Sequence, residues 1–180
     1  MLASGVLLAA GCAPKPTPTV NDSMTKVMQP QTQVIWDITS RAFNAKGDGL
    51  DGSKISPADW IRLAQSSRRV RDRARILADA PHVTVAKASD TVMGAFASHA
   101  GTKQTWDAAS AAQVQGLIDA DPAGFAKHAR ALADAMDTLH TATRTRDAAT
   151  VYAVSSGLDE TCDGCHQPFW GTDDPPPFPK

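Results

Sequence analysis

The chain has 180 residues, which suits one domain with a core of useful size and is short for two. Its 18 Lys and Arg nearly balance 19 Asp and Glu, so no basic surface for a nucleic-acid backbone is expected. With 42% hydrophobic residues, 21% charged residues and no apolar run of about 18 residues, a disordered or multi-spanning chain is excluded. Aromatic residues are only 6%, and Val, Ile and Tyr are sparse outside the helical segments, which favours helix over sheet.

The first segment is a short apolar run, residues 6–11, that stops at Cys12. It is too short to span a membrane and has the character of an export signal. Its end, Leu-Ala-Ala-Gly-Cys, resembles a bacterial lipoprotein signal, which implies cleavage before Cys12 and acylation of that cysteine. An ordinary cleaved signal with a spare cysteine is the alternative. We expect a lipoprotein-type signal over 1–11, a Pro-rich tether over 12–20, and a periplasmic protein held to a bacterial membrane only by lipid.

Two long segments follow in which apolar residues recur at alternating steps of three and four, as in amphipathic helices. The first is expected over residues 21–44, capped at 21–23, with a kink at Pro30. The second is expected over residues 56–79, with Pro57 at its first helical position. The two predicted inward stripes are Met24, Met28, Gln31, Ile35, Ile38 and Ala42, and then Trp60, Leu63, Ser67, Val70, Ala74 and Leu77.

The connection over residues 80–120 is long for a bundle, where about 2–8 residues are usual. Two short helices are therefore expected within it, over 90–99 and 110–118. Arginines crowd the second helix ahead of this connection. The simplest interpretation is a solvated face with local ion pairs, and contact with a partner or with an acidic group of a cofactor is the alternative. These arginines are Arg68, Arg69, Arg71, Arg73 and Arg75, with Asp72 among them.

The second half of the chain predicts two more long helices. The third starts at Asp121-Pro122, and the fourth runs from about Arg146 to Phe169. Four antiparallel helices with such stripes make a four-helix bundle, so we predict an all-α bundle domain over 21–170 and an irregular Pro-rich tail over 171–180. The stripes are Phe125, Ala129, Leu132, Met136, Leu139 and Thr143, and then Ala148, Val151, Ser155, Leu158, Cys162, Cys165 and Phe169.

Residues 162–166, Cys-Asp-Gly-Cys-His, form a CxxCH, the attachment pattern of haem c. Two thiols three residues apart reach the two vinyl groups on one edge of the porphyrin, and the adjacent imidazole comes under the iron as its proximal ligand. Structural zinc would need four ligands, and a thioredoxin-like pair would sit near a βαβ pattern that is absent. A plain Cys162–Cys165 disulfide leaves His166 unexplained. Because both cysteines lie on the inward stripe of the last helix, we expect one covalent haem c inside the bundle.

The pattern resembles the cytochrome c′ and c556 group of class II c-type cytochromes over most of the chain from Val20 to Trp170. The resemblance implies thioether bonds from Cys162 and Cys165, His166 as the proximal ligand, and a Met of the first helix on the distal side. The chain departs from the group at Gln29, where an acidic residue is expected, and in its long connection. The motifs that carry the resemblance are Val20-Asn21-Asp22-Ser23-Met24, Gln29-Pro30, Val34-Ile35-Trp36-Asp37, the CxxCH and Phe169-Trp170.

Four methionines compete for the distal position: Met24, Met28, Met93 and Met136. A Met on an apolar stripe is more often core filler than a ligand. In an up-down-up-down bundle, however, the start of the first helix lies level with the end of the last, and Met24 is nearer that end than Met28 by about 5 Å. Met93 lies in the long connection and Met136 in the middle of a helix. We therefore expect Met24 to be the distal ligand and Met28 a packing neighbour.

These expectations lead to three functional hypotheses. Iron held by His and Met is closed to substrate and has a raised potential, so the leading one is an electron carrier, not an enzyme, that serves an unidentified redox partner protein. If no Met reaches the iron, a five-coordinate haem would bind NO or CO, as cytochromes c′ do. A haem enzyme would need a distal acid–base group, whereas His128 and His140 are expected on the surface. Two-fold dimers are common for such bundles, so both a monomer and a homodimer remain open.

Overall fold

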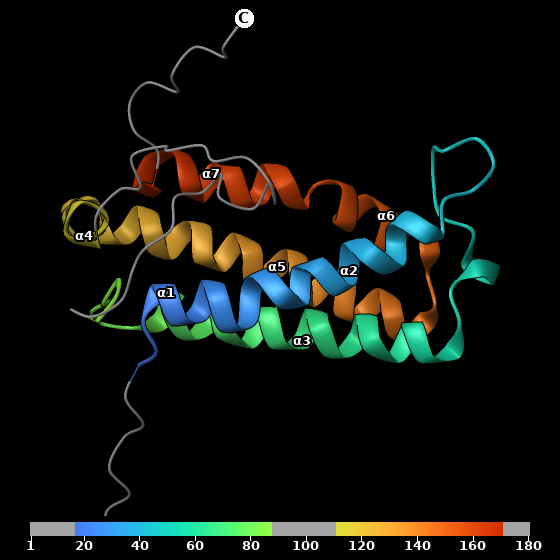
Figure 1. The fold of residues 1–180 in the computed structure, drawn as a ribbon, viewed down its shortest axis with the longest axis horizontal. Coiled ribbons are helices and arrows are strands. Elements are labelled where there is room, and N and C mark those ends of the chain that lie inside the picture. The colour runs from blue at the N-terminus through green and yellow to red at the C-terminus, as the bar shows by residue number, and fades with distance from the viewer. Residues whose placement is uncertain (1–16, 88–110, 171–180) are drawn as a thin grey trace, which may run out of the picture.

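The computed structural model describes residues 17–87 and 111–170, and over these ranges the predicted all-α fold is confirmed (Figure 1). The only backbone pairing of β type in the described ranges is an isolated bridge between Phe43 and Leu50. The predicted signal, most of the tether, the helix expected over 90–99 and the tail lie outside the described residues. The elements are α1 (Val20–Ser23), the π-helix η1 (Met24–Met28), α2 (Gln29–Arg41), the 3-10 helix η2 (Gly52–Lys54), α3 (Pro57–Asp79), α4 (Ala111–Ala120), α5 (Pro122–Thr145), α6 (Ala148–Ser156) and α7 (Leu158–Trp170).

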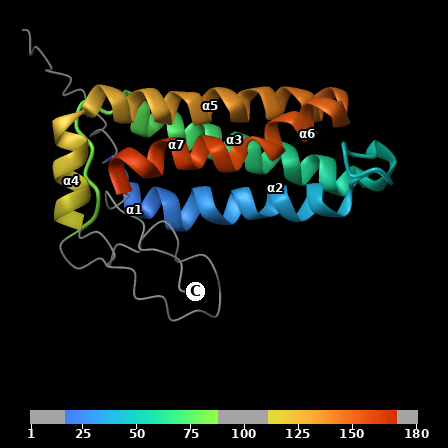
Figure 2. The same cartoon turned by 90° about the horizontal axis from the view of Figure 1, so that it is seen from above.

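The long helices lie side by side and alternate in direction (Figures 1 and 2). One rod is formed by α1, η1 and α2 in succession, and another by α6 and α7. The most extensive packing is between α3 and α5; α2 packs on α3, and both α6 and α7 pack on α5. Figure 2 shows α4 crossing the end of the bundle where α1 begins and α7 ends. The predicted up-down-up-down bundle therefore brings the start of the first helix to the end of the last.

Local capping explains where the two longest helices begin. Ser56 accepts a hydrogen bond from the Asp59 N–H at the start of α3, and Asp121 accepts one from the Gly124 N–H at the start of α5. A proline follows each cap, at the position where the missing N–H costs nothing. Both predicted starts are confirmed. The first helix differs from prediction because its cap is Thr19, ahead of residues 21–23.

The kink expected at Pro30 takes the form of a π-helical turn. In η1 the Gln29 N–H donates to the Met24 carbonyl five residues back, in place of a bond four residues back. A proline has no N–H, and its ring crowds the carbonyl four residues earlier. One wide turn ahead of Pro30 relieves that crowding, and π turns of this kind are frequent at functional sites.

The fourth helix is not continuous, contrary to prediction. It divides into α6 and α7 at Gly157, and its first residue is Ala148 because Arg146 adopts left-handed backbone (φ 54°) at the end of α5. Asp147 then caps α6 by accepting hydrogen bonds from the Ala149 and Thr150 N–H groups. The Gly157 break follows from the weak helix propensity of glycine, which costs about 1 kcal/mol relative to Ala.

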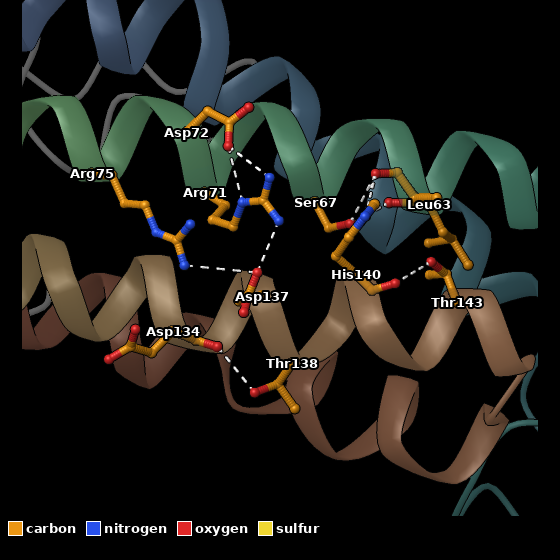
Figure 3. A network of polar contacts seen from close by, with 11 residues as sticks. Leu63, Ser67, Arg71, Asp72, Arg75, Asp134, Asp137, Thr138, His140 and Thr143 are labelled. Carbon is orange, nitrogen blue, oxygen red and sulfur yellow. Dashed lines mark hydrogen bonds and ion pairs between the residues drawn. The ribbon is translucent and has the colours of Figure 1, made fainter.

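The predicted stripes form the core of the bundle. Their fully buried members include Ile35, Ile38, Leu63, Val70, Leu77, Met136, Leu139, Val151 and Leu158. A polar seam joins α3 to α5 beside this core: Arg71 pairs with Asp72 and with Asp137, and Arg75 also reaches Asp137 (Figure 3). The expectation of local ion pairs is thus confirmed for Arg71, which in addition links two helices.

Candidate functional site

The CxxCH motif lies on α7, on the side that faces the bundle. Cys165 lies three residues after Cys162 and His166 lies four after it, so the two thiols and the imidazole share one helical face. All three side chains are partly buried, and Cys165 packs against the hydrophobic core. The arrangement predicted for the last helix is therefore present.

Burial sets the protonation of the two cysteines. It raises the pKa of both thiols to about 11; Asp159 and Asp163 add to the effect at Cys162, and Cys162 adds to it at Cys165. A redox-active CxxC needs the opposite shift, because the thiolate is its reactive form. The two thiols are also free of a disulfide here. The environment therefore argues against a thiol–disulfide catalyst.

The described side chains around the motif do not form a site for a metal ion bound directly by the protein. Within the described ranges, no group of three or more His, Cys, Asp or Glu gathers in a way that could hold one. Burial lowers the pKa of His166, opposed by the nearby Asp163 carboxylate, so its imidazole is neutral and has a lone pair at physiological pH. Two thiols one turn apart can form the two thioether bonds of a c-type haem, and such an imidazole can donate to its iron, so the residues fit that group.

An aromatic contact fixes the end of α7 on α5. Phe169 is 4% exposed, and its ring meets that of Phe125 edge-to-face with centroids 5.6 Å apart. His128 approaches the same ring at 6.1 Å and lies beside Gly164, where an added Cβ would be 3.8 Å from the imidazole. The motif is thus held between this contact and Leu158, which is buried at the start of α7.

The expectation that His128 and His140 lie on the surface is wrong, since both are partly buried. Each flanks the inward stripe of α5 and so falls where a neighbouring helix packs. His140 faces α3, with its Nδ1 3.0 Å from the Ala64 carbonyl oxygen (Figure 3). His128 faces α7. The sequence signal was available: both lie three or four residues from a stripe residue.

The methionine candidates occupy different environments. Met136 and Met28 are buried, at 0% and 5% exposure, whereas Met24 is partly buried and packs against the core. Met93 lies outside the described residues. Met24 is four residues from the start of α1 and His166 four from the end of α7, and these helix ends lie at the same end of the bundle (Figure 2). At about 1.5 Å per residue, both are about 6 Å from their helix ends.

Two features of the described residues are not predicted from the sequence. Pro168 lies inside α7 and leaves the Gly164 carbonyl without the N–H that would bond to it in a regular helix. The second feature is an extended segment, residues 83–85, whose backbone meets the first turn of α1. The proline two residues after the CxxCH motif was a visible signal of the first feature. No local pattern in the sequence indicates the second.

Comparison with known proteins gives one result. A family described as cytochrome C′ matches residues 62–170, which is more than half of the chain and includes the whole CxxCH motif. The matched region begins inside α3, so it leaves out the helix that carries Met24. No curated protein and no solved structure gives a significant match.

Proposed function

The chain belongs to the cytochrome c′ family, and from this membership we propose that it is a monohaem electron carrier that works outside the bacterial cytoplasm. The observation that carries the proposal is the shared, partly buried face of Cys162, Cys165 and His166 on α7. When bound there, a haem c supplies a one-electron iron couple. The role of the polypeptide is to hold the group, set its axial ligands and keep substrates away.

Each residue has a distinct role in this proposal. Cys162 and Cys165 would hold the group through two thioether bonds, and the neutral His166 imidazole would be the proximal ligand. Met24 would supply its sulfur as the second protein ligand and so exclude water and substrates, while Met28 would pack behind it. With both ligands supplied by the chain, a bound haem would serve electron exchange with a redox partner protein and would not bind a substrate.

Haem attachment is tested on a denaturing gel. Protein made in a host that matures c-type haem should keep its haem stain after boiling in detergent, since thioether bonds survive denaturation. Replacement of both Cys162 and Cys165 by Ala should abolish the stain. A colourless wild-type protein from such a host would refute the proposal.

Distal ligation is tested by optical spectroscopy with two matched variants. The oxidised wild type should be low-spin and show the long-wavelength band of a thioether–iron bond. Met24→Ala should make the iron high-spin and open to CO, whereas Met28→Ala, one turn away, should leave the spectrum unchanged. Loss of the band only in Met28→Ala would assign the ligand to Met28.

A second candidate function, reversible binding of NO or CO, is favoured by the extent of the family match. The match omits the Met24 helix, and Met24 is less buried than Met28. A five-coordinate iron behind an apolar wall would bind these gases. A high-spin oxidised spectrum with rapid CO binding in the wild type would favour this function over electron transfer.

We propose no enzymatic role, because His140 is held by the Ala64 carbonyl and His128 packs on α7.

We further propose that Cys12 anchors the protein by lipid on the outer side of a membrane. No helix in the described ranges is long and apolar enough to cross a bilayer. Wild-type protein should incorporate palmitate and partition into detergent, and Cys12→Ser should be released in soluble form. An unmodified N-terminus downstream of Cys12 would contradict the anchor.

A further inference from the structure

Residues 83–85, which we name the strap, cover the start of the first helix. The Val20 N–H donates to the Thr84 carbonyl at 2.9 Å, and the Asn21 N–H donates to the Val85 carbonyl at 2.8 Å. The first N–H groups of a helix have no partner within it. The strap therefore satisfies two of these donors and fixes where the helix starts.

The strap is in turn held by one side chain of α4. The Gln115 carbonyl oxygen accepts the Val85 N–H at 2.8 Å, and its amide nitrogen donates to the Val83 carbonyl at 2.9 Å. The same nitrogen donates to Asp119 at 2.9 Å, which fixes the orientation of the amide. Gln115 thus brackets the strap from the side as a neighbouring β-strand would.

Apolar burial fixes how deeply the strap lies against the core. The side chains of Val83 and Val85 are buried, and Val114 and Ile118 of α4 belong to the same core cluster. The packing sets the depth of the strap, but apolar contact has no direction along the chain. Its register along α4 is therefore set by the two hydrogen bonds of Gln115.

We propose that Gln115 is a positioning residue for the axial sulfur of Met24, an inference that rests on the proposed ligation by Met24. Met24 follows the tied residues Val20 and Asn21 within about one helical turn, and it opens the π-helical turn. Ligand geometry must hold to about 0.5 Å. Because the regular helix gives way to the π turn at Met24, the tie to the strap is the nearest fixed point of its helix and sets where the sulfur lies.

The test uses the haem-bearing protein and compares Gln115→Leu with wild type. Leucine keeps the volume of the side chain and removes both hydrogen bonds to the strap. Their loss should raise the fraction of iron open to CO by roughly tenfold and weaken the thioether band. Gln115→Glu keeps an acceptor for the Val85 N–H, so its CO binding and its thioether band should be intermediate between those of wild type and Gln115→Leu. Amide hydrogen exchange at Val20 and Asn21 should accelerate in Gln115→Leu.

The matched control is Gln33→Leu. Gln33 bonds to Asp37 at 2.8 Å on the exposed side of α2, away from the strap. The Gln33→Leu variant should leave the optical spectrum, CO binding and the hydrogen-exchange rates of the Val20 and Asn21 amides unchanged. If Gln115→Leu fails to fold with haem, the comparison is made with Gln115→Glu alone.

The outcomes separate the two proposals. A high-spin wild type refutes ligation by Met24 and the role of Gln115 with it. A low-spin wild type that loses its band in Met24→Ala establishes the ligation. If the Gln115 variants then keep the wild-type spectrum and CO binding while only their melting temperature falls, Gln115 is merely structural and the positioning role is overturned.

Discussion

Removal of the Phe169 ring should detach the end of α7 from α5. Of the 13 residues of α7, only Leu158 and Phe169 are buried, and the CxxCH motif lies between them. Truncation of a buried Phe to Ala costs about 3–5 kcal/mol. Phe169→Ala should therefore lower the free energy of unfolding by about this amount and expose the motif to solvent.

The aromatic part of this contact can be separated from simple burial. Phe169→Leu keeps most of the apolar area but loses the edge-to-face contact with Phe125. A double-mutant cycle of Phe169→Leu with Phe125→Leu should give a coupling of about 1 kcal/mol. The more exposed pair of Phe43 and Tyr152, with centroids 6.0 Å apart, is the control and should couple more weakly.

Urea unfolding followed by far-UV circular dichroism gives these free energies, and hydrogen exchange along α7 locates the effect. The dependence of the unfolding free energy on urea concentration should be the same in the variants and the wild type, since only then does a shift of the midpoint report a change in stability. A cost below about 1 kcal/mol for Phe169→Ala would refute the reasoning, because a buried ring that holds a helix end cannot be lost so cheaply. Equal couplings in the two aromatic pairs would show that the Phe125 contact has no special role.

Three further predictions concern capping, charge and backbone. Asp121→Ala removes the cap of α5 and should lower the free energy of unfolding by about 1 kcal/mol in urea titrations. The hydrogen bond from Arg71 holds the pKa of Asp137 below its ordinary value, so the pair stabilises the folded protein above about pH 4. This stabilisation is lost as the pH falls further, and Asp137→Asn should reduce the loss of unfolding free energy at acid pH. Pro30→Ala should raise the melting temperature but weaken the thioether band, because restoring a regular turn rotates Met24 by about 100°.

The sequence was sufficient wherever local physics decides the structure. The starts of α3 and α5 follow from a capping side chain with a proline after it, and both were predicted to the residue. The buried stripes follow from helical periodicity alone, because residues three and four apart share a face. The spacing of the CxxCH likewise puts its two cysteines and its histidine on one face of α7, where they are partly buried.

Features that depend on distant residues were not predictable in this way. The strap gives its carbonyls to a helix that begins more than sixty residues earlier, so no local pattern marks it. The surroundings of His128 and His140 depend on which helix packs beside α5. The division at Gly157 is not predicted by periodicity, because the apolar stripe continues through it, and only the low helix propensity of one glycine marks the break.

Departures from regular helix gather in the two rods that carry the candidate ligands. The π turn includes Met24, and Pro168 lies two residues beyond His166. Each departure forgoes regular backbone hydrogen bonds, whereas α3 and α5 are long and uninterrupted. Stability alone would favour the same regularity in every rod. Each irregularity has a local cause, Pro30 in the first rod and Gly157 and Pro168 in the last, and these are the two rods that carry the proposed ligands, as expected where function competes with local regularity.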